Sequence, residues 1–182
     1  LITFADPGLC TTLGERLRRV RHRLAGEEMF LANYGDTLTD APLDRLIERF
    51  RADTATASFL SVPPAVYPFR VLRVGADDRV EAILSTGESD LWINGGYFTL
   101  RQAIFDVIQP GDELVDAPFA RLIAEGRLHT ERYQGFWHPL DTLRDLEHLE
   151  GLAAGGRPPW APWVAAERGE PHNTESTARV TT

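Results

Sequence analysis

The sequence predicts an α/β protein with a mixed sheet. In the first part of the chain, short apolar runs typical of strands alternate with segments whose apolar residues recur every three or four positions, as in helices. A β-rich stretch follows in the middle of the chain. Alternating strands and helices favour parallel pairing, whereas consecutive strands favour antiparallel pairing, so the two together predict a mixed sheet.

Strand and helix patterns alternate from the start of the chain to residue 62. Leu13, Leu17, Val20 and Leu24 fall on one face of a helix, and the apolar run 29–34 is typical of a buried strand. The predicted elements are a strand over 1–5 that begins abruptly, a helix over 12–24, a strand over 29–34, a helix from Pro42 and a strand over 56–62.

The rest of the domain is predicted from turn and cap residues. The turn 75–78 is typical of a hairpin, and Thr142 with Asp145 fits a helix capping box. A glycine pair inside a strand predicts a bulge or a close backbone approach. The predicted elements are a hairpin over 69–84, a strand over 91–100, short helices near 102–108 and 118–125, a strand over 128–137 and a helix over 142–152. We expect residues 1–163 to form the domain and the polar residues 164–182 a disordered tail.

Composition excludes several classes of function. The 182 residues carry a net charge of −8, and all 19 basic residues are arginine, so no lysine is present to grip a phosphate or form a Schiff base. The acidic balance argues against nucleic-acid binding. No apolar run approaches the roughly 18 residues of a membrane span. The single cysteine, Cys10, suits a reducing compartment, and we expect a cytoplasmic protein.

Two aspartates that follow predicted strands are candidate ligands for Mg²⁺. Asp36 comes directly after the run 29–34, and ligands of open α/β sheets bind beyond the carboxyl ends of strands. Asp141 lies between a predicted strand and the last helix. Mg²⁺ takes one or two protein carboxylates together with substrate phosphates and water. The structural alternative is that Asp36 is a turn residue and Asp141 a helix-start residue favoured by the helix dipole.

Two further groups are candidates for substrate binding. Asn94, Gly95 and Gly96 combine an amide with two glycines, which allows hydrogen bonds to sugar hydroxyls from the side chain and the backbone. The alternative is a purely structural bulge. The arginine-rich helix 12–24 could bind phosphates, but nearby glutamates favour a solvated face. The five histidines show no metal-ligand spacing.

The order of these motifs resembles the sugar-1-phosphate nucleotidyltransferase family, and most closely its glucose-1-phosphate cytidylyltransferase group, over residues 1–163. Four segments carry the resemblance. They are 14–20, similar to G-G-R-L-K-R-V; 34–40, similar to Y-G-D-G-x-x-D; 92–98, similar to W-I-N-G-G-F-F; and 135–145, similar to G-F-W-x-P-M-D-T-L-R-D.

The resemblance implies a fold and an activity. The fold is a Rossmann-like nucleotidyltransferase domain, usually found in homo-oligomers. The activity joins a sugar 1-phosphate, such as glucose 1-phosphate, to a nucleoside triphosphate, CTP in the closest group, and releases pyrophosphate. The family's two Mg²⁺ ligands correspond to Asp36 and Asp141. Its sugar contacts correspond to Asn94, Gly95 and Gly96, and a family arginine that reaches the triphosphate corresponds to Arg16.

Three family motifs have no counterpart in this sequence. The glycine-rich G-G-x-G-T-R loop with its P-K pair is absent, the E-K-P motif is replaced near Ser85, Thr86 and Gly87, and R-F-G is replaced near 66–68. Residue 1 is Leu and the only Met is Met29, so we expect either a non-standard start codon or a lost amino-terminal nucleotide-binding half. We therefore expect little activity from this chain alone. Two alternatives remain: a non-catalytic paralogue that binds sugar phosphate or assists assembly, and a related glycosyltransferase, which usually needs a D-x-D motif that the sequence lacks.

Overall fold

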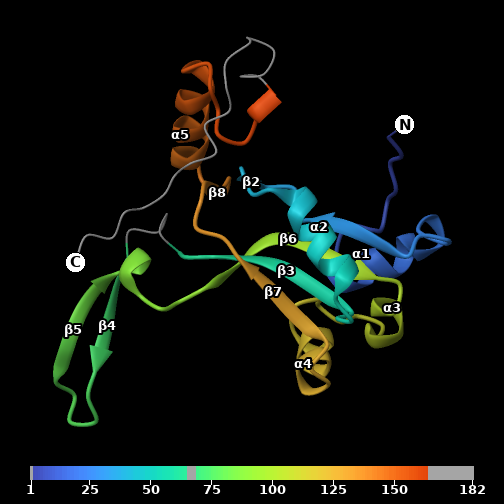
Figure 1. The fold of residues 1–182 in the computed structure, drawn as a ribbon, viewed down its shortest axis with the longest axis horizontal. Helices are drawn as coiled ribbons and strands as arrows, with labels where there is room; N and C mark the ends of the chain where they lie inside the picture. Colours follow the sequence, from blue (N-terminus) through green and yellow to red (C-terminus); the bar gives the residue numbers. More distant parts are fainter. Residues whose placement is uncertain (1, 65–68, 164–182) are drawn as a thin grey trace. The chain divides into compact units, whose positions relative to one another are not determined.

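The computed structural model describes residues 2–64 and 69–163 (Figure 1). The chain divides into two compact units, which are described separately. Unit 1 comprises Leu1–Gly35 and Pro42–Tyr133, and unit 2 comprises Asp36–Ala41 and Gln134–Thr182. The tail predicted over 164–182 lies outside the described residues. Within the described ranges, no helix is long and apolar enough to cross a membrane.

A four-stranded mixed sheet organises unit 1, with the strand order β1-β6-β3-β7. Strands β1 (Met29–Asn33) and β3 (Ala57–Val62) each pair antiparallel with β6 (Ile93–Arg101), and β7 (Leu128–Arg132) runs parallel to β3. Because β1 and β3 flank the same antiparallel partner, they run in the same direction, and α2 (Leu43–Ala52) connects them. The predicted α/β class with a mixed sheet is confirmed.

One face of this sheet carries the apolar core of unit 1. The helices that accompany this core are α1 (Leu13–Val20), which is followed by a 3₁₀ turn (Arg21–Arg23), α3 (Ile104–Val107) and α4 (Ala117–Ala124). Helix α1 begins where Thr12 accepts a hydrogen bond from the amide of Glu15. Alternate residues of the central strands point into the core because side chains of a strand alternate between the two faces. The buried residues of this cluster are Leu17, Phe30, Ala57, Phe98, Leu100, Ile104, Phe105, Ile108, Leu114, Phe119 and Leu122.

Two predictions for the start of the chain are wrong. Residues 2–5 form no strand, and Ile2 and Phe4 are 82% and 91% exposed, because an apolar β-prone segment becomes a strand only where a partner strand is present. Strand β1 forms as predicted but is an edge strand, with Leu31 52% exposed, and not a buried one. An apolar run in the sequence indicates a strand but does not indicate which neighbouring elements cover that strand.

The predicted hairpin is present in unit 1. Strands β4 (Arg70–Val74) and β5 (Val80–Ser85) pair antiparallel, and Asp78 adopts a left-handed conformation in the turn between them. A 3₁₀ turn over Thr86–Glu88 follows β5. Ser85 and Glu88 form a reciprocal capping box at this turn.

Unit 2 contains a small ribbon and the last helix. Strand β2 (Thr37–Thr39) pairs antiparallel with β8 (Trp137–Pro139), and α5 (Leu143–Ala154) follows. The single strand predicted over 128–137 is thus wrong, because the chain forms β7 in unit 1 and β8 in unit 2. The capping box predicted for Thr142 and Asp145 is confirmed at the start of α5. Among the described residues of unit 2, Trp137 and Leu149 are large side chains that are buried, and the ring of Trp160 lies 5.6 Å from that of Phe136.

Candidate functional site

The β2–β8 ribbon brings the two predicted metal aspartates to one end of a short ladder. Thr37 faces Pro139, so the next pair along the ladder is Asp36 and Leu140. The amide of Leu140 donates a 2.7 Å hydrogen bond to the main-chain oxygen of Asp36. Asp141 follows Leu140 directly, and both aspartates are exposed. Backbone pairing within unit 2 therefore places the main chains of Asp36 and Asp141 at neighbouring positions of adjoining segments.

The turn before β2 does not use the carboxylate of Asp36. Asn33 makes that turn, because its Oδ1 accepts a hydrogen bond from the amide of Gly35, which has a φ of +90°. Among the described residues, the Asp36 carboxylate has neither a hydrogen bond nor an ion pair. The alternative of Asp36 as a turn-forming side chain therefore has no contact to support it.

Helix α5 likewise leaves the carboxylate of Asp141 unused. The cap is Thr142, and Asp145 accepts hydrogen bonds from the Thr142 hydroxyl at 2.7 Å and from the Thr142 amide at 2.8 Å. The hydroxyl bond, followed by the amide bonds, lowers the pKa of Asp145 below its usual value. The main-chain amide of Asp141 also donates to the Asp145 carboxylate. The carboxylate of Asp141 itself has no partner in the part of the chain that the structure describes. Asp145, not Asp141, is the capping aspartate.

The donor set at this end of the ribbon is small. Over the described ranges, no group of three or more His, Cys, Asp and Glu side chains is arranged to hold a metal ion. Asp36 and Asp141 could supply two hard oxygen ligands. Such a pair fits Mg²⁺, which usually completes its coordination with substrate phosphates and waters, and does not fit a closed structural metal site.

The segment Asn94-Gly95-Gly96 lies at the start of strand β6 in unit 1, where the pairing with β3 is irregular. Against β3, the register shifts so that Phe59 faces Phe98 while Ser61 faces Asn94, which confirms the predicted bulge. Asn94 Oδ1 accepts from the amide of Gly96 at 2.9 Å, and Gly96 has a φ of +78°, a conformation that favours glycine. The local backbone therefore requires the glycine and orients the amide side chain.

Tyr34 is a contributor that the sequence interpretation did not single out. Asn94 Nδ2 donates a 2.7 Å hydrogen bond to the Tyr34 hydroxyl, and the Tyr34 ring packs edge-on against Phe98 at 5.2 Å. Both the nitrogen and the oxygen of the Asn94 side-chain amide thus make a hydrogen bond. These two bonds use one of the two Nδ2 hydrogens and one of the two Oδ1 lone pairs. The position of Tyr34 in the 34–40 motif is the sequence feature that could have identified it as a site residue.

Arg16 differs from its neighbours on α1. Arg18 and Arg19 both pair with Glu15, at 3.2 and 3.0 Å, and the Arg19 hydrogen bond is the main cause of a lowered pKa for Glu15. Arg16 is exposed, donates from Nε to the Thr11 carbonyl at 3.1 Å and forms no ion pair with any described residue. Its guanidinium retains donors for an anionic ligand.

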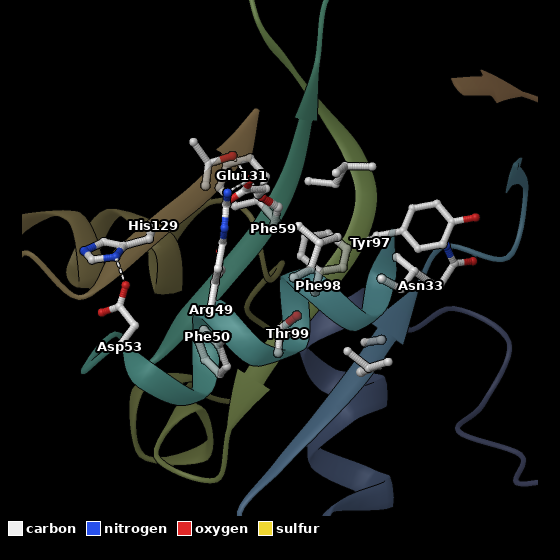
Figure 2. A pocket seen from close by; sticks show the side chains of 17 residues that line it. Asn33, Arg49, Phe50, Asp53, Phe59, Tyr97, Phe98, Thr99, His129 and Glu131 are labelled. Atoms are coloured by element: carbon white, nitrogen blue, oxygen red, sulfur yellow. Dashed lines mark hydrogen bonds and ion pairs between the residues drawn. The ribbon is translucent and has the colours of Figure 1, made fainter. Parts of the chain in front are cut away.

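A pocket of about 340 Å³ lies between α2 and the sheet face opposite the core (Figure 2). Its apolar lining includes Leu31, Leu46 and Phe50. Two pairs of polar side chains that contact each other also line it, Arg49 with Glu131 and Asp53 with His129. None of the predicted site residues lines this pocket. The sequence interpretation did not identify it, since it depends on how α2 packs on the sheet.

The position of the replaced E-K-P motif is occupied by a local cap. Glu88 Oε2 accepts from the Ser85 hydroxyl at 2.6 Å and from the Ser85 amide at 3.0 Å. These bonds lower the pKa of Glu88. The replacement of the family R-F-G, over 66–68, lies outside the described residues. The described segment thus uses its acidic side chain to close a turn.

Comparison with known proteins first defines the class by fold. A Bacillus anthracis protein described as a glucose-1-phosphate thymidylyltransferase, solved in complex with sucrose, superposes with a TM-score of 0.60 and 15% identity, over 83% of this chain and 64% of that one. HddC from Yersinia pseudotuberculosis superposes with a TM-score of 0.51 and 15% identity, over 75% and 60%. The chain therefore has the fold of a sugar-1-phosphate nucleotidyltransferase, as predicted.

Sequence comparison then finds relatives that belong to one group of that class. The chain is 33% identical to the glucose-1-phosphate cytidylyltransferases of Salmonella typhimurium strain LT2 and of Salmonella typhi, over 168 residues. The matched region makes up 89% of this chain and 63% of each relative, so the chain spans less than two thirds of their length. The resemblance to this group is confirmed. The sequence matches no protein-family model.

Proposed function

We propose that this chain supplies the metal-binding and sugar-binding part of a sugar-1-phosphate nucleotidyltransferase. The reaction is nucleotidyl transfer from CTP to a sugar 1-phosphate such as glucose 1-phosphate, which yields a nucleotide sugar and pyrophosphate for carbohydrate biosynthesis. The similarity to two glucose-1-phosphate cytidylyltransferases supports this reaction. The observation that carries it is the β2–β8 ladder, in which Asp36 and the residue before Asp141 are hydrogen-bonded while both carboxylates are left unused.

In this reaction the protein forms no covalent bond with the substrates. An oxygen of the sugar phosphate attacks the α-phosphorus of the triphosphate in line, a new P–O bond forms, and the bond to pyrophosphate breaks. Mg²⁺, when bound, neutralises charge on the phosphates. Asp36 and Asp141 would hold it, because an exposed pair of carboxylates without other partners suits a hard cation that keeps waters and phosphate ligands. Catalysis then rests mainly on positioning and charge neutralisation.

Other residues of this chain would bind the substrates. The Asn94 amide, oriented by Tyr34 and Gly96, would hydrogen-bond sugar hydroxyls together with the backbone of Gly95 and Gly96. Arg16 would contact phosphate through the guanidinium donors that its bond to Thr11 does not use.

A pyrophosphate-release assay with CTP, glucose 1-phosphate and Mg²⁺ tests the proposed reaction. The chain alone is expected to show no turnover above background, because it spans only 63% of the active relatives. Turnover is expected when the chain is co-expressed with a polypeptide that carries the remaining stretch of the Salmonella typhimurium relative. Omitting either substrate is the control. Robust turnover by the isolated chain contradicts the proposal that it supplies only part of the enzyme.

A second candidate function is non-catalytic binding of sugar phosphate or assistance to assembly. The observation that favours it is the Ser85–Glu88 cap, which stands where the family has a Glu-Lys pair. Calorimetric titration separates the two candidates. Binding of glucose 1-phosphate by the chain, together with no turnover after co-assembly, favours the binding function. Turnover after co-assembly excludes it.

Several attributes stay predictions from the sequence. They are homo-oligomeric assembly, a cytoplasmic location and the absence of nucleic-acid and membrane partners. The identities of the sugar and the base also rest on the relatives alone. Size-exclusion chromatography with light scattering tests the oligomer, and assays with other triphosphates and sugar phosphates test the substrates.

A further inference from the structure

Three neighbouring strands of the unit 1 sheet place polar residues in one row. Strands β6, β3 and β7 lie side by side (Figure 1). Ser61 on β3 is the register partner of Asn94 on β6 and of Arg132 on β7. Residues that face each other on neighbouring strands point to the same face of the sheet. Asn94 and Arg132 therefore share a face, with their main chains about 10 Å apart, because strands are spaced by about 4.8 Å.

An aromatic ring and a backbone hydrogen bond hold Arg132 in this row. The Cζ atom of its guanidinium lies 5.4 Å from the centroid of the Trp92 ring, which is a cation–π contact. The amide of Tyr133, the next residue, donates to the main-chain oxygen of Ser61 at 2.9 Å. Arg132 stands at the carboxyl end of β7, which runs parallel to β3. Ligands of open α/β sheets bind beyond this end of the parallel strands.

The guanidinium of Arg132 has donors available for an anion. The side chain is exposed, and among the described residues it forms neither an ion pair nor a hydrogen bond. Arg101, the other arginine in the strands of this sheet, donates to Glu28 at 2.8 Å and to several main-chain oxygens. Glu131, the neighbour of Arg132 on β7, pairs with Arg49 and by strand alternation lies on the opposite face. Arg132 is thus the arginine of these four strands that can receive a ligand.

We propose that Arg132, supported by Trp92, binds the phosphate of the sugar 1-phosphate, while Asn94 binds sugar hydroxyls on the same face of the sheet. The chain has no lysine, so any fixed side-chain cation that it brings to a phosphate is an arginine. A guanidinium can donate to two phosphate oxygens at once. This proposal rests on the proposed function for the identity of the ligand. It adds the residue that distinguishes a sugar phosphate from an unphosphorylated sugar.

Titration of the isolated chain, followed by NMR, tests the assignment. Glucose 1-phosphate, glucose and CTP are added separately, and the side-chain N–H signals of Trp92 and Asn94 report the dissociation constants. Arg132→Gln removes the charge and is expected to raise the constant for glucose 1-phosphate at least about tenfold, with that for glucose unchanged. Arg132→Lys keeps the charge without the planar fork and should give an intermediate loss. Arg73→Gln makes the same charge change at an exposed site on β4, and this control should bind like the wild type.

The outcomes separate the role of Arg132 from the proposed function. Equal binding of glucose 1-phosphate by Arg132→Gln and by the wild type overturns the assignment and leaves the proposed function intact. Equal weakening of glucose and glucose 1-phosphate shows a purely structural role and also overturns it, as does a loss confined to CTP. Binding that depends on Arg132, without turnover after co-assembly, upholds the assignment and refutes the proposed function. No binding of glucose 1-phosphate by the wild type refutes both.

Discussion

The main-chain oxygen of Asp36 accepts a 2.7 Å hydrogen bond from the amide of Leu140, the residue immediately before Asp141. This bond extends the β2–β8 ladder to the point where both segments leave it. Other side chains stabilise the local backbone: Asn33 closes the turn before β2, and Thr142 with Asp145 caps α5. Asp36 and Asp141 are therefore positioned by the backbone and have carboxylates available for a ligand.

Loss of either carboxylate should abolish most of the activity of the co-assembled enzyme. Asp36→Asn and Asp141→Asn each replace an anionic oxygen ligand by a neutral one, which Mg²⁺ disfavours. We expect turnover to fall by on the order of 100-fold or more. Glu147→Gln, an exposed carboxylate on α5, is the control and should retain near-normal rates. Pyrophosphate release at saturating substrates measures the effect, and near-normal rates in both aspartate variants would refute the metal assignment.

Tyr34→Phe should weaken sugar binding without preventing chemistry. The substitution removes the hydroxyl that accepts the Asn94 bond but keeps the ring that packs on Phe98. The loss of one neutral hydrogen bond of about 1 kcal/mol corresponds to a roughly fivefold rise in KM for the sugar phosphate. The measurement is a KM and kcat determination on the co-assembled enzyme. An unchanged KM, or a fall confined to kcat, contradicts a positioning role for Tyr34.

Gly14→Ala should destabilise the chain because the docking of α1 requires a glycine. A Cβ at position 14 would lie 2.4 Å from the carbonyl oxygen of Asp112, which also accepts a 2.7 Å hydrogen bond from Thr12. Relief of this clash requires backbone movement and should cost about 1–3 kcal/mol of unfolding free energy. Gly151→Ala in α5, where a Cβ meets nothing within 4 Å, should instead stabilise by about 0.5–1 kcal/mol. Denaturant unfolding compares the two; equal effects contradict the close approach.

Acid should weaken the contact between Asp112 and Arg121. Arg121 Nη1 donates to Asp112 Oδ2 at 2.7 Å, and this bond is the first cause of the lowered pKa of Asp112. Because the folded-state pKa lies below that of the unfolded chain, the stabilisation is complete above the unfolded-state value and is lost as pH falls through the folded-state value.

Asp112→Asn should therefore be less stable than the wild type at neutral pH, with the difference shrinking as pH falls through the lowered pKa of Asp112. A double-mutant cycle with Arg121→Gln, followed by chemical denaturation at several pH values, isolates the pair. A coupling energy that persists at acid pH contradicts the assignment.

The sequence predicted the elements better than their surroundings. Helices 12–24 and 142–152 and the hairpin were predictable because periodicity, caps and turn residues are local signals. The status of β1 was not, because an apolar run does not record which strands lie beside it. The division of 128–137 into β7 and β8 was not predictable either, since alternation continues across a segment that changes partners.

The candidate site shows the same limit. Asp36 and Asp141 were identified from strand ends and motif resemblance, and the ladder adds how the backbone brings them together. Tyr34 and Asn94 are 60 residues apart, and Asn94 lies where the β3–β6 register shifts, which no local sequence pattern specifies. The pocket beside α2 was missed because it depends on helix-to-sheet packing.

Binding of Mn²⁺, a paramagnetic substitute for Mg²⁺, tests the central claim most directly, because it needs neither activity nor a partner. In amide NMR spectra of the isolated chain, the account predicts that substoichiometric Mn²⁺ broadens resonances centred on Asp36 and Asp141. Asp36→Asn or Asp141→Asn should each remove this broadening, and Glu147→Gln should leave it. Broadening that centres on other acidic residues, or that survives both aspartate substitutions, would contradict the claim that these two carboxylates form the metal site.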